Sequence, residues 1–152
     1  MIYILVALKA EAQAFVDKYK LKNYKNNDIQ VIISGIGADA MFKATTKVLE
    51  TYSQNDVIIN IGICGADKTY KIGQLIDARY EKITCIDYEA TNEKYKIVDM
   101  ESAGFLKATK DIKNSFIFKI VSDHFEPRTV TKDMAKKLIF KQIDEIINRI
   151  NI

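Results

Sequence analysis

Apolar runs alternate with amphipathic segments along this chain. Continuous apolar runs predict buried strands over residues 2–7, 29–33, 56–61 and 115–121. Shorter apolar runs predict further strands over 74–78, 82–86 and 94–98. Apolar positions at helical spacing predict helices over 10–19, 41–52 and 101–110, and a last helix that has Thr131 as its N-cap. Strands buried on both faces and separated by helices indicate an α/β protein, with a mostly parallel central sheet and helices on both faces.

The length and composition indicate one domain. The chain has 152 residues, of which 48% are hydrophobic, and this is sufficient for one core. It contains one proline, Pro127, and it shows no low-complexity linker and no internal repeat. We therefore expect a single domain over residues 1–152.

The charge and hydropathy patterns argue against nucleic-acid and membrane partners. The net charge is only +3, and the lysines are scattered instead of forming a basic stripe. No segment approaches the roughly 18 uninterrupted apolar residues that a membrane span requires. The apolar N-terminus is short and lacks a basic leader, so it is interpreted as a buried strand. These features favour a cytoplasmic protein.

The cysteine and histidine content argues against a metal centre. Cys64 and Cys85 show no CxxC spacing, and neither has a histidine partner near it. His124 is the only histidine, which removes most options for a zinc site or for Cys/His catalysis. We expect no metal and no organic cofactor.

Polar residues and glycines follow the predicted strands. Glu11 comes after the first strand, the Gly35 turn after the second, the Gly62–Gly65 turn after the third and Asp123 after the last. Glu101 follows the next-to-last strand by a few residues. Ligands of α/β sheets gather beyond the carboxyl ends of the strands, so we expect these groups to converge on one cleft. Glycines there let backbone N–H groups approach a ligand, although a tight strand-to-helix turn is the better explanation of each glycine taken singly.

Five segments, in their order along the chain, resemble the purine nucleoside phosphorylase and methylthioadenosine/S-adenosylhomocysteine nucleosidase superfamily. They are Ala7-Leu8-Lys9-Ala10-Glu11-Ala12, Ser34-Gly35-Ile36-Gly37, Asn60-Ile61-Gly62-Ile63-Cys64-Gly65-Ala66, Val98-Asp99-Met100-Glu101-Ser102-Ala103 and Ile120-Val121-Ser122-Asp123-His124. The resemblance implies a three-layer phosphorylase-like fold. It also implies a small-molecule nucleoside ligand and assembly into a homodimer or a higher homo-oligomer.

The resemblance assigns the main catalytic role to Asp123. The matching aspartate of the family donates a proton or a hydrogen bond to N7 of a purine, which makes the base a better leaving group. Ser122 would orient Asp123, and His124 matches a Ser-Asp-His variant seen in some phosphorylases. From the residues alone, an Asp that caps the turn before Pro127 is the better interpretation of Asp123, and His124 is equally a turn histidine.

The resemblance assigns the other site roles to residues on both sides of the predicted cleft. Glu101 would accept hydrogen bonds from the ribose 2′- and 3′-hydroxyls while Met100 packs on the sugar, although a glutamate is also favoured in the first turn of any helix. Glu11 would position and deprotonate the attacking water, or else be an exposed helix residue. The Gly turn would contact the substrate through Ile63, Cys64 and Gly65.

Three departures from the family pattern bear on the activity. Ile63 stands where the nucleosidases have a small polar residue. No counterpart is evident for the basic residues with which the phosphorylases hold phosphate. The region between Cys85 and Lys94 is only a few residues long where the family carries a base-binding loop, so Tyr88 and Tyr95 are the candidates to replace its aromatic stack.

Together these features favour an N-ribosyl hydrolase, a nucleosidase that acts on a purine nucleoside or thionucleoside. Hydrolysis is preferred over phosphorolysis because Glu11 is present and phosphate ligands are not evident. Two alternatives stay open. One is a nucleoside phosphorylase, and the other is a non-catalytic nucleoside-binding or scaffold protein that lacks the base pocket.

Overall fold

The computed structural model describes residues 1–91 and 94–151. Positions 92 and 93, within the short region between Cys85 and Lys94, lie outside the described residues, as does position 152. The strands are β1 (Ile2–Val6), β2 (Ile29–Ile33), β3 (Val57–Ala66), β4 (Leu75–Asp77), β5 (Thr84–Cys85), β6 (Ile97–Asp99) and β7 (Ser115–Asp123). The helices are α1 (Lys9–Tyr19), α2 (Ala38–Leu49), α3 (Ser102–Ala108), the 3-10 turn η1 (Pro127–Thr129) and α4 (Lys132–Ile150).

The strands of the described chain form one mostly parallel sheet, as predicted. Its path runs β2-β1-β3-β6-β5, and β7 pairs with both β3 and β4. Pairing is parallel for β1 with β2 and β3, for β3 with β7 and for β5 with β6. It is antiparallel for β3 with β6 and for β4 with β7. The central strands β1, β3 and β7 therefore end towards the same edge of the sheet.

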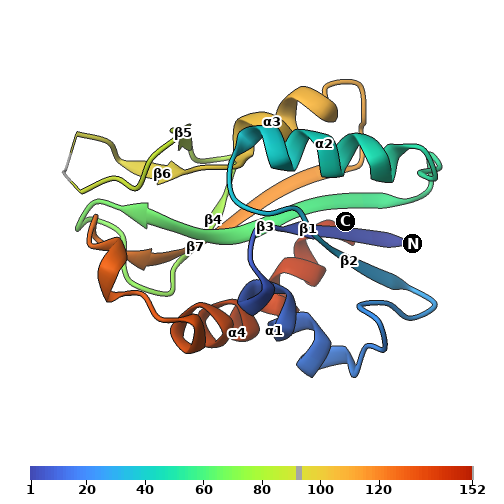
Figure 1. Ribbon diagram of the computed structural model, residues 1–152, viewed down its shortest axis with the longest axis horizontal. Coiled ribbons are helices and arrows are strands. Elements are labelled where there is room, and N and C mark those ends of the chain that lie inside the picture. Colours follow the sequence, from blue (N-terminus) through green and yellow to red (C-terminus); the bar gives the residue numbers. More distant parts are fainter. Residues whose placement is uncertain (92–93, 152) are drawn as a thin grey trace.

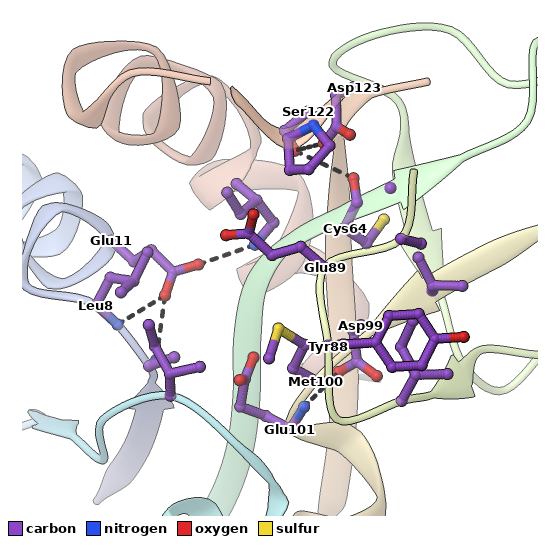
Figure 2. Close-up of a pocket in the computed structure, with 18 residues that line it drawn as sticks. Leu8, Glu11, Cys64, Tyr88, Glu89, Asp99, Met100, Glu101, Ser122 and Asp123 are labelled. Carbon is purple, nitrogen blue, oxygen red and sulfur yellow. Dashed lines mark hydrogen bonds between the residues drawn. The ribbon is translucent and has the colours of Figure 1, made fainter. Parts of the chain in front are cut away.

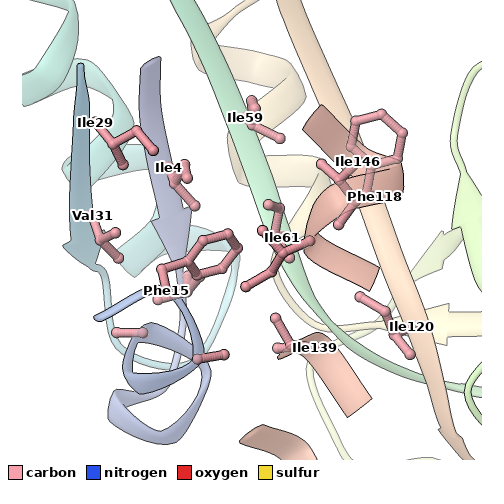
Figure 3. Packing of buried hydrophobic residues seen from close by; sticks show 14 of the residues in the cluster. Ile4, Phe15, Ile29, Val31, Ile59, Ile61, Phe118, Ile120, Ile139 and Ile146 are labelled. Carbon is pink, nitrogen blue, oxygen red and sulfur yellow. The ribbon is translucent and has the colours of Figure 1, made fainter. Parts of the chain in front are cut away.

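Helices cover both faces of the sheet (Figure 1), which confirms the three-layer arrangement. Helices α1 and α4 pack on one face, where Figure 3 shows Phe15, Ile139 and Ile146 against the strand residues Ile61 and Phe118. Helices α2 and α3 cover the other face through Met41, Val48 and Phe105. Burial of these apolar side chains is the main force that holds the layers together.

Helix α4 follows its sequence prediction closely. The Thr131 hydroxyl caps the helix by accepting a hydrogen bond from the Met134 amide at 3.1 Å. The isoleucines that line its apolar face are buried, namely Ile139, Ile143, Ile146 and Ile150. Among the residues that the structure describes, neither α4 nor any other helix combines the length and apolar character that crossing a bilayer requires.

The Gly62–Gly65 segment is not a turn, contrary to the prediction. It is the second half of β3, which pairs in parallel with β7 as far as Gly65 and in antiparallel fashion with β6 through Gly65 and Ala66. Strands β6 and β7 are distant from β3 in the sequence, so their pairing leaves no local pattern. The glycines of the segment therefore suggested a turn, although pairing in the sheet makes the segment a strand. Asp123 likewise ends β7 instead of following it.

Close contact between α2 and α3 positions one side of the site. A Cβ atom on Gly104 would lie 1.9 Å from the Ala38 carbonyl oxygen, so only glycine permits this approach. The approach brings Glu101, the N-cap residue of α3, beside Gly37, the N-cap residue of α2. The two helix starts therefore meet at the edge of the sheet.

Candidate functional site

A cavity of about 150 Å³ lies where β1, β3 and β7 end (Figure 2). The structure brings all of the predicted site residues to its lining, namely Glu11, Ile63, Cys64, Gly65, Met100, Glu101, Ser122 and Asp123. Figure 2 shows the carboxylates of Glu11 and Glu101 directed into the same space, with Asp123 beyond them. His124 does not line the cavity; its Nδ1 lies 3.1 Å from the Ala66 carbonyl oxygen.

Glu11 is buried at the start of α1, with 2% of its surface exposed, so it is not an exposed helix residue. Its Oε1 accepts hydrogen bonds from the amides of Ala7 and Leu8 at 3.1 and 2.9 Å. Its Oε2 accepts one from the Ile63 amide at 2.9 Å. Burial raises the pKa of Glu11 above its usual value, although nearby Lys119 and the backbone amides oppose the rise. A carboxylate held rigidly in this way, with a raised pKa, is suited to accept a proton.

Glu101 is positioned by the two helix starts on the opposite side of the cavity. Its Oε2 accepts a hydrogen bond from the Gly37 amide at 2.8 Å. Gly37 has φ +105°, a conformation that other residues rarely adopt, so the predicted glycine turn serves to aim this amide at Glu101. Burial raises the pKa of Glu101, opposed first by the charge of Lys119. Among residues 1–91 and 94–151, no group donates a hydrogen bond to the other carboxylate oxygen, which faces the cavity.

Asp123 is oriented by its own turn and by Ser122. Its Oδ2 accepts a hydrogen bond from the Glu126 amide at 2.9 Å, so it does cap the turn before Pro127. Its Oδ1 accepts one from the Ser122 hydroxyl at 2.7 Å, which is the orienting contact that the sequence predicts. Capping the turn and facing the cavity are therefore compatible, because the two bonds hold the carboxyl group in place at the cavity wall.

Comparison with solved structures addresses the fold. A protein from Francisella philomiragia assigned as a 5′-methylthioadenosine/S-adenosylhomocysteine nucleosidase gives a TM-score of 0.77 at 15% identity, covering 99% of this chain and 98% of that chain. Futalosine hydrolase of Helicobacter pylori gives a TM-score of 0.72 at 14% identity, covering 95% and 97% of the two chains. The nucleosidase of Neisseria meningitidis, in complex with methylthio-immucillin-A, gives 0.73 at 14% identity, covering 96% and 97%. No protein-family model and no curated sequence matches the chain.

The chain has the fold of the methylthioadenosine/S-adenosylhomocysteine nucleosidases. At these identities the superposition establishes the fold alone, which is the fold that the resemblance of the five segments implies. The roles of individual side chains in this nucleosidase-like fold rest on their geometry in the present chain.

Lys119 is the principal residue of the site region that the sequence prediction missed. It lies in the middle of β7 with 1% of its surface exposed, and its Nζ is 3.0 Å from Asp99 Oδ2. Burial acts to lower the pKa of Lys119, but the charges of Asp99, Glu101 and Glu11 outweigh it and raise the value. Lys119 is therefore a buried cation surrounded by carboxylates. The available signal was a single lysine inside the apolar run 115–121, because lysine is almost never fully buried unless paired.

Asp99 links Lys119 to the start of α3. Its Oδ1 accepts a hydrogen bond from the Ser102 hydroxyl at 2.6 Å, and its Oδ2 accepts one from the Ser102 amide at 2.8 Å. Burial acts to raise the pKa of Asp99, but Lys119 and these hydrogen bonds lower it overall. Because its oxygens are already engaged, Asp99 serves to hold Lys119 and the Glu101 segment in position.

Gly62 leaves room for the charged groups of the site. A Cβ atom at this position would lie 2.9 Å from Glu11 Oε2 and 3.3 Å from Lys119 Nζ. The lack of a side chain at Gly62 thus allows Glu11 and Lys119, from two other elements, to approach the backbone closely. A larger residue would displace the Glu11 carboxylate from its amide donors.

The segment after β5 forms the remaining wall of the cavity. Ile86, Tyr88, Glu89 and Ala90 line it. The Tyr88 and Tyr95 hydroxyls lie 3.2 Å apart, so Tyr95 supports Tyr88 without lining the cavity itself. Tyr88 is the aromatic residue that the short segment offers for stacking on a base.

Two observations concern the metal-ligating and thiol side chains of residues 1–91 and 94–151. These residues contain no cluster of His, Cys, Asp and Glu that could hold a metal ion. Cys64 lines the cavity, but burial raises its pKa strongly, so it is a poor nucleophile.

Proposed function

We propose that this protein is an N-ribosyl hydrolase that cleaves the glycosidic bond of a purine nucleoside or thionucleoside. One observation carries the proposal: Glu11, Glu101 and Asp123 come from three distant segments and line a single cavity. A nucleosidase needs a group for the water, one for the sugar and one for the base. The nucleosidase-like fold and the bound nucleoside analogue of the Neisseria meningitidis nucleosidase further support the proposal.

In the proposed reaction, Asp123 acts on the leaving base. A proton passes from the Asp123 carboxyl group to N7 of the purine while the bond between C1′ and N9 breaks, and the bonding electron pair leaves with the base. The sugar gains oxocarbenium character, as in glycoside hydrolysis. Glu11 then takes a proton from the water whose oxygen forms the new bond to C1′, so the products are free base and ribose.

Glu101 and Lys119 have supporting roles in this proposal. The free carboxylate oxygen of Glu101 accepts hydrogen bonds from the ribose 2′- and 3′-hydroxyls, while Met100 packs on the sugar. The carboxylates around the cavity favour the positive charge that develops on the sugar. Lys119 offsets part of the repulsion among Asp99, Glu101 and Glu11, which allows these buried carboxylates to remain close together.

Water is favoured over phosphate as the nucleophile. No lysine or arginine is among the described residues that line the cavity, and Lys119 is already engaged by Asp99. A phosphate dianion placed near Glu11 and Glu101 would be repelled by both carboxylates. Phosphorolysis is therefore the less favoured alternative.

Base release from adenosine, inosine and methylthioadenosine tests the proposed function. The purified protein is expected to release free base without added phosphate, and phosphate is expected not to accelerate the reaction. If calorimetry detects nucleoside binding but no base is released from a broad panel, the non-catalytic binding alternative replaces the hydrolase. A strict requirement for phosphate would show instead that the protein is a phosphorylase.

Glu101→Gln is expected to raise KM about 10- to 100-fold, because charge-assisted hydrogen bonds to the ribose hydroxyls are lost. The glutamine retains an oxygen that can accept a hydrogen bond from the Gly37 amide, so the local fold is preserved. Glu50→Gln, at an exposed position after α2, is the matched control and should leave KM unchanged. The prediction fails if KM for a ribonucleoside is unaffected, or if a 2′,3′-dideoxynucleoside loses as much affinity as the ribonucleoside.

We also propose that the protein assembles as a homodimer or a higher homo-oligomer. Ile36 and Tyr88 line the cavity and are nevertheless 62% and 49% exposed, so a second copy could cover this open side. Light scattering at micromolar concentration is expected to give at least twice the mass of one chain. A monomer at every loading concentration would contradict this proposal.

A further inference from the structure

The carboxylates that line the cavity differ in how many hydrogen bonds they already accept. Glu11 accepts three, Asp123 accepts two and Glu101 accepts one. Glu89 also lines the cavity, yet within the described part of the chain no group donates a hydrogen bond to its carboxylate or forms an ion pair with it. Both carboxylate oxygens of Glu89 are therefore available to a ligand.

Glu89 lies at the base end of the cavity. A second cavity, of about 750 Å³, continues from the first and shares Asp123 and Glu89 with it. Met100 and Glu101, the residues proposed for the sugar, line only the first cavity. In Figure 2 the Glu89 side chain reaches from the segment after β5 towards the space between Glu11 and Asp123. We therefore group Glu89 with Asp123, the residue proposed for the base.

Asp123 and Glu89 meet different edges of a bound purine, because they come from different walls. Asp123 ends β7 and is proposed to act on N7. Glu89 follows β5, the strand at the end of the sheet path. A purine has one edge that carries N7, one that carries N3 beside the sugar, and one that carries N1 between the substituents of C2 and C6. With N7 at Asp123 and the sugar at Glu101, the edge that remains for Glu89 is the N1 edge.

The chemistry of a carboxylate decides which base suits this position. An ionised carboxylate accepts hydrogen bonds and donates none, and its two oxygens match two parallel N–H groups. Guanine presents such a pair at the N1 edge, namely N1–H and the 2-amino group. Adenine presents the lone pair of N1 there, which a carboxylate repels. No lysine or arginine is among the described residues that line the first cavity, so no cation competes for Glu89 on that side.

We propose that Glu89 selects the base, and that the preferred substrate is a purine nucleoside with N–H donors at N1 and on C2, such as guanosine. This proposal rests on the proposed hydrolase function and names the class of base on which it acts. Glu89 is a specificity-determining residue here. It takes no part in the cleavage of the bond between C1′ and N9.

A comparison of bases tests the proposal. The value of kcat/KM for guanosine is expected to exceed that for adenosine about 10- to 100-fold, the discrimination that one bidentate pair provides. Inosine has N1–H but lacks the 2-amino group, so it is expected to lie between the two. In 1-methylguanosine a methyl group replaces N1–H, so this substrate is expected to lose most of the advantage of guanosine.

Glu89→Gln is expected to reverse the preference. The glutamine oxygen can accept a hydrogen bond from the 6-amino group of adenine while its NH₂ group donates one to N1, so adenosine gains and guanosine loses. Asp87→Asn is the matched control, because Asp87 is exposed in the same segment and lines neither cavity. It should leave the order of the substrates unchanged. The proposal is overturned if the wild type does not prefer guanosine to adenosine, or if Glu89→Gln retains that preference.

Failure of this proposal is distinguishable from failure of the proposed function. If purine nucleosides are cleaved without a preference for guanosine, the hydrolase stands and the role of Glu89 falls. If no nucleoside is cleaved, calorimetry of guanosine against adenosine still tests Glu89. Tighter binding of guanosine that Glu89→Gln abolishes would support the role, and equal binding of both nucleosides would overturn it.

Discussion

Asp123→Asn is expected to lower kcat by about 10²–10⁴-fold, the range for loss of a general acid. The amide that replaces the carboxyl group cannot release a proton to N7 at any accessible pH. It retains an oxygen that can accept a hydrogen bond from the Glu126 amide or from the Ser122 hydroxyl, so the turn that holds residue 123 remains supported. The loss should therefore appear in kcat, with little change in the unfolding midpoint. Steady-state base release and a urea titration measure the two quantities.

Asp144→Asn is the matched control for this substitution. Asp144 lies on α4, pairs with Lys18 and has a side chain that is 76% exposed, so it lacks the buried position expected of a catalytic acid. Its substitution should change kcat by less than twofold. A small effect of Asp123→Asn, comparable to that of the control, would remove Asp123 from the catalytic role.

Lys119→Met is expected to reduce the free energy of unfolding by about 3–5 kcal/mol, the usual range when one partner of a buried ion pair is removed. The substitution leaves Asp99 buried without its cation, and it also removes the charge that offsets Glu11 and Glu101. These carboxyl groups must then take up protons or remain charged in a place without water. Urea unfolding at neutral pH measures the loss.

Two further variants show whether the charge is the cause. Lys119→Met combined with Asp99→Asn should recover part of the lost stability, because the unpaired carboxylate is then absent. Lys18→Met removes an exposed pair with Asp144 and should change stability by less than about 1 kcal/mol. If Lys119→Met is no more destabilising than Lys18→Met, the buried lysine does not hold the acidic cluster together.

The sheet and most of the helices were predictable because their apolar patterns are local. Strand β2 and the apolar face of α4 match their predicted positions closely, since burial of one face imposes a period that the chain displays directly. The convergence of Glu11, Glu101 and Asp123 was also predictable, because each lies near the end of a strand of one sheet.

The missing parts of the prediction depend on partners that are distant in sequence. The second half of β3 is a strand only because β6 and β7 lie beside it. In the sequence, Lys119 is a single polar residue within an apolar run, and only the folded sheet places Asp99 next to it. In each case the role comes from tertiary contacts that no local pattern records.

The source of the oxygen in the sugar product tests the central claim most directly. The protein is incubated with adenosine or methylthioadenosine in H₂¹⁸O without phosphate, and the products are analysed by mass spectrometry. The sugar exchanges its C1 oxygen with water slowly, so it is trapped early by reduction and compared with an unlabelled sugar incubated for the same time. The account predicts free base together with sugar that carries one ¹⁸O at C1, and it predicts that Glu11→Gln abolishes both. Absence of base release from wild-type protein, or release only with phosphate and with formation of a sugar 1-phosphate, would contradict it.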